Sequence, residues 1–134
     1  MVRDRLGKIF DELQRQGWDR HYFGGDRTPV GLAASKQWEV YDEVPIRWAD
    51  VVIIHSRSQG AAFRTRVQGD TDLFAPDIVS WQKQGKPIRV IKAVLRLDSP
   101  GKRGAPWGYE APKEWCAVPP DWPFPETLYF NDSL

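Results

Sequence analysis

The residues most able to do chemistry in this chain are flat aromatic rings and cationic side chains. Seven Trp, six Phe and four Tyr occur among 134 residues. Such rings fill hydrophobic cores, and they also stack on planar ligands and on unpaired bases. Arginine and lysine hold phosphate oxygens. The composition therefore indicates either an aromatic-rich core or a surface for a planar, anionic ligand.

The charged residues are segregated along the sequence. Residues 55–103 contain ten basic and four acidic residues, whereas residues 104–134 contain one lysine and five carboxylates. The net charge of +1 hides this difference. The middle of the chain is therefore a candidate anion-binding surface. The alternative is that the acidic end folds over the basic middle and neutralises it.

Two polar side chains, His55 and Ser56, directly follow the apolar residues 51–54. That run is typical of a central strand, so both side chains should emerge at the rim of a sheet or barrel. They could offer hydrogen bonds to a ligand. They could equally be a histidine satisfied within the fold and a turn-forming serine.

The evidence for catalysis or metal binding is weak. His21 and His55 are too few and too far apart in sequence to indicate a metal centre, and Gly24-Gly25 lacks the features of a phosphate loop. The single Cys116 excludes a disulfide framework and a cysteine-rich zinc site, and a buried inert thiol is its favoured interpretation. We therefore expect no cofactor, no metal and binding rather than catalysis.

An amphipathic helix is expected over residues 3–16, ending at Gly17. Its apolar stripe has helical spacing and comprises Val2, Leu6, Ile9, Phe10 and Leu13. The helix should pack on a sheet, although a partner-binding helix is the alternative. Because the chain opens with charged residues and has no long apolar run, we expect a cytosolic protein without a secretion signal or membrane span.

The expected β-core spans residues 38–98. Residues 19–36 contain Gly and Pro at several positions and predict a loop. Alternating or continuous apolar residues predict four strands, over residues 38–44, 50–55, 61–67 and 88–98. The second and third should form a hairpin. Residues 74–85 predict a polar excursion between strands.

Seven prolines forbid regular structure through most of residues 99–134, yet seven aromatic residues lie among them. A disordered tail would be poor in aromatic residues. We therefore expect an irregular strap pinned to the body by its rings, with an edge strand near residues 115–118. The whole chain, residues 1–134, should be one α+β domain.

Two stretches resemble adjacent strands of the PUA-like superfamily, especially its EVE branch. They are Trp48-Ala-Asp-Val-Val-Ile-Ile-His-Ser56 and Gly60-Ala-Ala-Phe-Arg-Thr-Arg-Val67. The segments Phe74–Trp81 and Lys86–Leu97 are similar to the excursion and long strand that follow in that family. The resemblance covers residues 38–98. It implies a small, mostly antiparallel β pseudobarrel that binds nucleic acid, DNA or RNA.

In the EVE branch a pocket of aromatic and polar side chains is thought to hold a modified base taken out of the stack. The resemblance implies candidate pocket residues here, which are Trp38, Tyr41, Trp48, His55, Ser56 and Trp81. It implies phosphate-binding cations, which are Arg57, Arg64, Arg66, Arg89 and Lys92. Such a module would suit a DNA-defence or RNA-processing system, fused to a nuclease or working beside one.

Two other functions remain open. The first is a small nucleic-acid enzyme, such as a ribonuclease of the ASCH kind, in which His55, Lys92 and Cys116 would be the reactive residues. The second is a protein-interaction or immunity domain that uses the aromatic strap as its interface.

Overall fold

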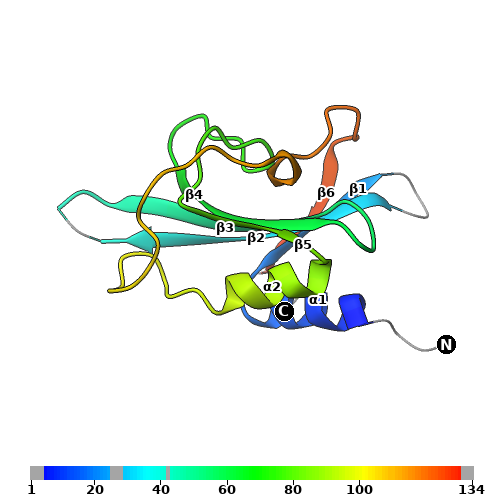
Figure 1. The fold of residues 1–134 in the computed structure, drawn as a ribbon, viewed down its shortest axis with the longest axis horizontal. Coiled ribbons are helices and arrows are strands. Elements are labelled where there is room, and N and C mark those ends of the chain that lie inside the picture. The colour runs from blue at the N-terminus through cyan, green and yellow to red at the C-terminus, as the bar shows by residue number, and fades with distance from the viewer. Residues whose placement is uncertain (1–4, 25–28, 42, 131–134) are drawn as a thin grey trace.

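The computed structural model describes residues 5–24, 29–41 and 43–130. These residues form one sheet of six strands, in the order β5-β4-β3-β2-β1-β6, with every neighbouring pair antiparallel. Both α-helices lie on one face, which we call the helical face. Residues 106–124 cross the opposite face, the strap face (Figure 1). The architecture is therefore α+β, as expected.

In chain order the elements are α1 (Arg5–Arg15), β1 (Asp19–Gly24), β2 (Pro29–Val40), β3 (Ile46–Ile54), β4 (Gly60–Val67), β5 (Trp81–Gly85), α2 (Pro87–Leu95), the 3₁₀ helix η1 (Glu114–Cys116) and β6 (Pro125–Leu128). Neither α-helix is long and apolar enough to cross a membrane, in the part of the chain that is described.

Three sequence expectations are confirmed. The helix expected over residues 3–16 is α1, which buries Phe10 and Leu13. The strands expected at 50–55 and 61–67 are β3 and β4, joined as an antiparallel hairpin with Ile54 opposite Gly60. The strand expected at 38–44 is only the end of β2, which begins nine residues earlier.

The loop expected over residues 19–36 is wrong over residues 19–24 and 29–36, because β1 and most of β2 lie there, and residues 25–28 lie outside the described residues. Gly31 was one reason to expect a loop. In the structure it lies inside β2, where the Trp122 ring packs so closely over its backbone that any Cβ would overlap the indole. The glycine is needed for this contact, since a strand interior otherwise disfavours it.

The long strand expected at 88–98 is also wrong, because this segment forms α2. Its β-branched residues favoured a strand, but Pro87 at the first helical turn favours a helix start. The buried residues are Pro87, Val90, Ile91 and Val94, which have helical spacing. Packing on the sheet therefore decided between two locally acceptable conformations.

The sheet does not close into the expected pseudobarrel, since β5 and β6 remain its two edges. The edge strand expected near residues 115–118 is wrong as well. That segment contains η1, and the edge strand is β6, which pairs with β1. The strap is irregular as expected, but only some of its rings hold it. Trp122 packs on Phe23, whereas the exposed aromatic residues of the strap include Trp107, Tyr109, Phe124 and Tyr129.

Two hydrophobic cores form, one on each face of the sheet. The core on the helical face includes Phe10, Trp18, Val52, Val90 and Ile91. The core on the strap face includes Phe23, Val51, Phe63, Val79 and Cys116. Because β3 is buried on both faces, it supplies both cores, as its continuous apolar run predicted.

Candidate functional site

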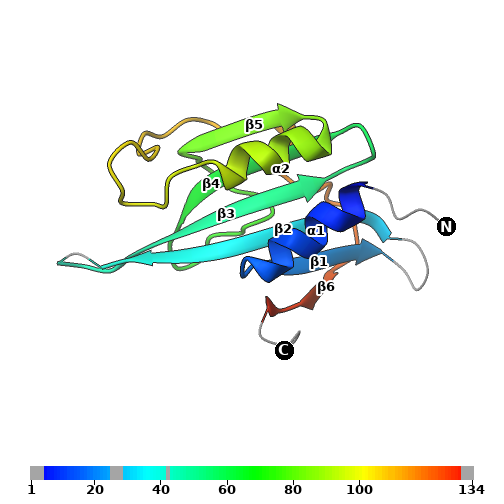
Figure 2. The same cartoon turned by 90° about the horizontal axis from the view of Figure 1, so that it is seen from below.

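A basic groove lies between the two helices, which run side by side on the helical face (Figure 2). Its volume is about 280 Å³. The floor is made by Ile9 and Ile88, and the cations Arg5, Lys8 and Lys92 line the rest. We call it the helical groove. It combines an apolar base with a positively charged rim.

The amphipathic pattern of the helices puts these cations at the surface. α1 turns Phe10 and Leu13 toward the sheet, so Lys8 remains exposed. α2 turns Val90 and Val94 inward, so Arg89, Lys92 and Arg96 remain exposed. Both helices therefore present cations to solvent, and Lys8 and Lys92 meet at the helical groove.

The carboxylates of α1 are held by arginines outside the groove. Asp11 accepts a hydrogen bond of 3.0 Å from Arg20 Nη1, and Glu12 accepts one of 2.9 Å from Arg15 Nε. The hydrogen bond from Arg15 lowers the pKa of Glu12, and a second one from Gln16 adds to this. Since both carboxylates already have arginine partners, they do little to neutralise Lys8 and Lys92.

The start of α2 adds to the positive potential. The residue before it is Lys86, no side chain caps its first turn, and the first turn holds no acidic residue. Helix amino termini carry a partial positive charge. An anion lying along the helical groove would meet both this helix end and the lysine and arginine side chains.

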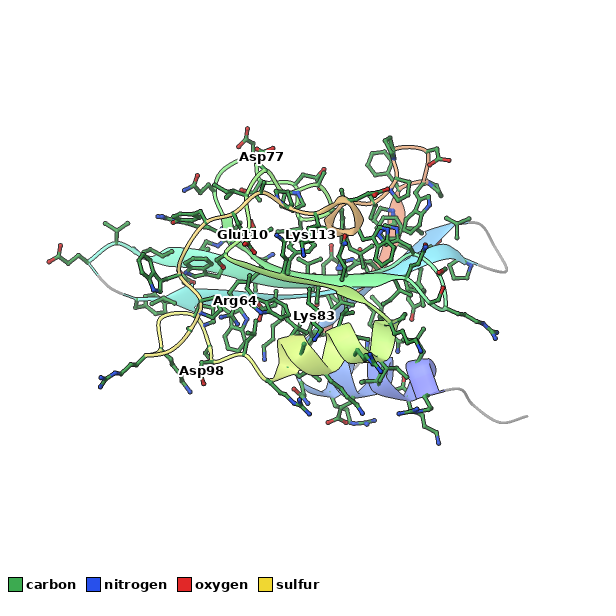
Figure 3. The ribbon with its side chains drawn as sticks, viewed as in Figure 1. Arg64, Asp77, Lys83, Asp98, Glu110 and Lys113 are labelled. Atoms are coloured by element: carbon green, nitrogen blue, oxygen red, sulfur yellow. The ribbon has the colours of Figure 1, made fainter. Side chains whose placement is uncertain are left out.

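The described part of the acidic end, residues 104–130, does not cover this face. Glu110, Glu114 and Asp121 belong to the segment that crosses the opposite face of the sheet, and Glu126 lies on β6, the edge strand farthest from β5. Figure 3 shows Glu110 on the side of the sheet away from the helices. Within the described ranges, no ion pair joins these carboxylates to cations of residues 55–103. The described carboxylates of this segment, Glu110, Glu114, Asp121 and Glu126, therefore do not neutralise the cations of the helices, whereas Asp132 lies outside the described residues.

The predicted base pocket does not assemble. Trp38 and Trp48 face each other across β2 and β3, whereas His55 follows the other end of β3. Seven residues of strand separate Trp48 from His55, which corresponds to about 23 Å. Tyr41, 78% exposed, follows the end of β2 and Ser56 lies in the β3–β4 turn. These residues cannot surround one base.

The rings and the histidine of this predicted pocket also have structural partners. Trp38 Nε1 donates to Asp50 Oδ2 at 3.0 Å, and Trp81 packs against the core under the helices. The His55 ring bonds through Nε2 to the Trp115 carbonyl at 2.8 Å. The prediction of one pocket beside His55 is therefore wrong, because the sheet places its members at opposite ends and on opposite faces.

Arg64 is not a phosphate ligand, which corrects another prediction. Its side chain is 1% exposed and forms a two-pronged ion pair with Asp50, with Nε to Oδ1 at 2.6 Å and Nη2 to Oδ2 at 2.9 Å. Nη1 donates to the Asp98 carbonyl at 2.8 Å. The guanidinium thus ties two strands to the segment after α2.

The other predicted phosphate ligands divide into two groups. Arg89 and Lys92 are both exposed on α2, and Lys92 lines the helical groove. Arg57 is exposed in the β3–β4 turn, and Arg66 lines a separate polar hollow with Asp70 and other carboxylates. Of these four, only Lys92 therefore lines the helical groove. Arg5 and Lys8 were missed, although the polar side of the expected first helix already contained them.

The three suspects for an enzymatic site do not all meet, because His55 bonds the Trp115 carbonyl next to Cys116, whereas Lys92 lies on α2. Cys116 is fully buried, and burial raises the pKa of its thiol to about 11, so it is a poor nucleophile. Lys92 lies on the helical face and Cys116 belongs to the core of the strap face. Among the described residues, no group of three or more His, Cys, Asp or Glu could hold a metal ion.

A buried histidine that the sequence did not single out has a structural role. His21 Nε2 lies 2.8 Å from Ser35 Oγ, and Nδ1 lies 2.9 Å from Thr127 Oγ1. Burial lowers its pKa to about 4, with Asp19 opposing the shift. The ring is therefore neutral at pH 7 and joins three strands through two hydroxyl groups.

Comparisons with known proteins return no relatives. No family model matches the sequence, and neither a curated protein nor a solved structure is significantly similar to the chain. The resemblance to the EVE branch therefore stays a prediction, and function must be argued from this site.

Proposed function

We propose that this protein is a nucleic-acid-binding module that holds the phosphate backbone along the helical groove. The supporting observation is the groove itself, where Arg5, Lys8 and Lys92 surround an isoleucine floor. Arg89 is a further exposed cation on α2. Among the described residues no carboxylate lines this groove, and a cluster of cations suits a polyanion because each contact releases a condensed counterion.

The shape of this face favours a polyanion over a lipid surface. Membrane-binding helices present large apolar side chains outward. Here Ile9 and Ile88 are partly buried at the floor, and the cations project beyond them. The proposal does not include a base pocket, since the rings expected to form one lie apart. It predicts binding with little sequence preference.

The test is a titration of labelled DNA and RNA oligonucleotides by fluorescence anisotropy at several salt concentrations. If about five phosphates are contacted, the slope of log K against log salt should be about −4.5 for duplex DNA. Affinity should then fall roughly 500-fold between about 50 and 200 mM salt. No detectable binding at low salt would refute the proposal.

A matched pair of charge reversals locates the site. Lys92→Glu should weaken binding by about tenfold or more at 0.1 M salt and reduce the slope by about one. Arg47→Glu makes the same charge change on β3, at an exposed position whose guanidinium bonds Gln37. It should bind almost as the wild type does. Equal losses in both variants would indicate a diffuse charge effect and not a groove.

A further inference from the structure

The outer edge of β5 is a second surface with features of a binding site. β5 ends the sheet and has no strand partner on its outer side within the described residues. A groove of about 480 Å³ follows this edge, between the last turn of α2 and the strap. Three cations line it, Lys83, Arg96 and Lys113, and no carboxylate does.

The hydrogen-bond pattern of the sheet shows which backbone groups of β5 face outward. The amide of His55 donates to the Gln59 carbonyl, which closes the β3–β4 hairpin. In an antiparallel ladder successive residues bond alternately to opposite neighbours. Counting along β4 from Gln59, every second residue (Ala61, Phe63) bonds to β3. Ala62 lies between them and bonds to β5, where its partner is Lys83. It follows that the N–H and C=O groups of Gln82 and Gln84 point away from the sheet.

This edge already accepts one antiparallel pairing from within the chain. Just before β5, Val79 and Glu110 exchange two backbone hydrogen bonds of 2.9 and 2.8 Å. The strap then stays on the strap face, where the side chains of Gln82 and Gln84 bond its backbone at Lys113 and Trp115. The strap therefore engages these glutamine side chains, while their backbone groups remain available on the edge.

The cations lie on both sides of this edge. Lys83 is in register with Ala62 and so belongs to the helical face, and Arg96 directly follows α2. Lys113 comes from the strap, and Figure 3 shows Lys113 and Lys83 on opposite sides of the sheet. A strand added to β5 would therefore meet positive charge with the side chains of both of its faces.

We propose that β5 binds an extended, acidic peptide segment of a partner protein by strand addition. The segment would bond the outward backbone groups of Gln82 and Gln84, and its carboxylates would lie beside Lys83, Arg96 and Lys113. A second copy of this chain fits less well. Antiparallel pairing of two β5 strands about a twofold axis at their centres places Lys83 opposite Lys83, and like charges in directly opposed positions are unfavourable.

The experiment uses the full chain and a fluorescein-labelled peptide of about eight residues that repeats Val-Glu-Glu, so that carboxylates lie on both faces of the added strand. We expect saturable binding by anisotropy and no binding of the matching valine–lysine peptide. N-methylation of the peptide amides that face β5 keeps the charge and removes the donors. It should weaken binding by roughly tenfold or more if backbone pairing holds the peptide. Equal affinity after N-methylation would overturn strand addition, as would no binding of the unmodified peptide.

Two double variants separate this site from the helical groove. Lys83→Glu with Lys113→Glu should abolish peptide binding and leave oligonucleotide binding within about twofold, since neither residue lines the helical groove. Lys8→Glu with Lys92→Glu should abolish oligonucleotide binding and leave peptide binding within about twofold. Loss of peptide binding only in the second variant would place the peptide on the helices and refute the proposal. Self-association through β5 that the peptide does not displace would also refute it.

Discussion

The buried ion pair between Arg64 and Asp50 gives the sharpest prediction about stability. Asp50→Asn keeps the shape of the side chain but leaves the Arg64 guanidinium buried without its counter-charge. Removing one partner of a buried pair costs about 3–5 kcal/mol. Both side chains are at most 3% exposed, so water cannot replace the lost carboxylate. We therefore expect a loss at the upper part of that range.

The expected change in melting temperature follows from chain length. An unfolding entropy of about 2.1 cal/mol/K per residue gives about 280 cal/mol/K for this chain, so each kcal/mol shifts Tm by about 3.6 °C. A loss of about 4–5 kcal/mol for Asp50→Asn should therefore lower Tm by roughly 14–18 °C. Urea unfolding and calorimetry measure both quantities.

The double variant Asp50→Leu with Arg64→Met provides the control, because it removes both charges at once. It should recover much of the loss, since apolar side chains can replace a buried ion pair at little cost. Trp38 and the Asp98 carbonyl lose partners in this variant, so recovery should be incomplete. A loss below about 1 kcal/mol for Asp50→Asn would contradict the argument, because it would mean that the pair is solvated.

Three further predictions concern single residues. Gly31→Ala should destabilise the fold by about 1–3 kcal/mol, because its methyl group would overlap Trp122, whereas Gly69→Ala, with open space around it, should change Tm little. His21 binds no proton in the folded state until pH about 4, while the unfolded chain binds one below about pH 6.5, so stability should fall as pH drops from 6.5 to 4. In urea unfolding, His21→Gln should reduce the dependence of stability on pH between 6.5 and 4. An NMR titration that gives the folded His21 ring a pKa near 6.5 would contradict this explanation. The Cys116 thiol should react with a disulfide reagent only when the protein unfolds, and fast labelling at neutral pH would show that it is not sealed.

Local sequence patterns predicted the elements in which pattern and packing agree. The apolar stripe of α1 fits only a helix, and the continuous apolar run of β3 fits a strand buried on both faces. The segment 88–98 has two acceptable conformations, since its β-branched residues suit a strand and the spacing of its buried residues suits a helix. The choice was made by the sheet and by α1, which pack on Val90 and Ile91 and lie far away in sequence.

The error over residues 19–36 has a similar origin. Glycine and proline were taken as signs of a loop, but Gly31 accommodates the Trp122 ring from a segment 91 residues later in the chain. No local pattern contains that contact. His21 was likewise considered only as a metal ligand, because its partners Ser35 and Thr127 become neighbours only through strand pairing.

The candidate site was predicted in part. The positive charge of residues 55–103 is visible in the sequence, and one of the cations predicted to bind phosphate, Lys92, lines the helical groove, while Arg89 is exposed on the same helix. Arg5 and Lys8 lie on the polar side of the first helix, but that they share a groove with Lys92 follows only once 87–95 is a helix beside α1. Burial of Arg64 could not be foreseen, because it depends on Asp50 lying opposite it on β3.

The most direct test of the central claim is an NMR titration of ¹⁵N-labelled protein with a short duplex DNA at low salt. The account predicts that the amides that shift belong to α1 and α2, with the largest changes near Lys8, Arg89 and Lys92, and that the shifts reverse when salt is added. Shifts concentrated on the strap face around Trp122 and Phe124, with the helices unchanged, would contradict it.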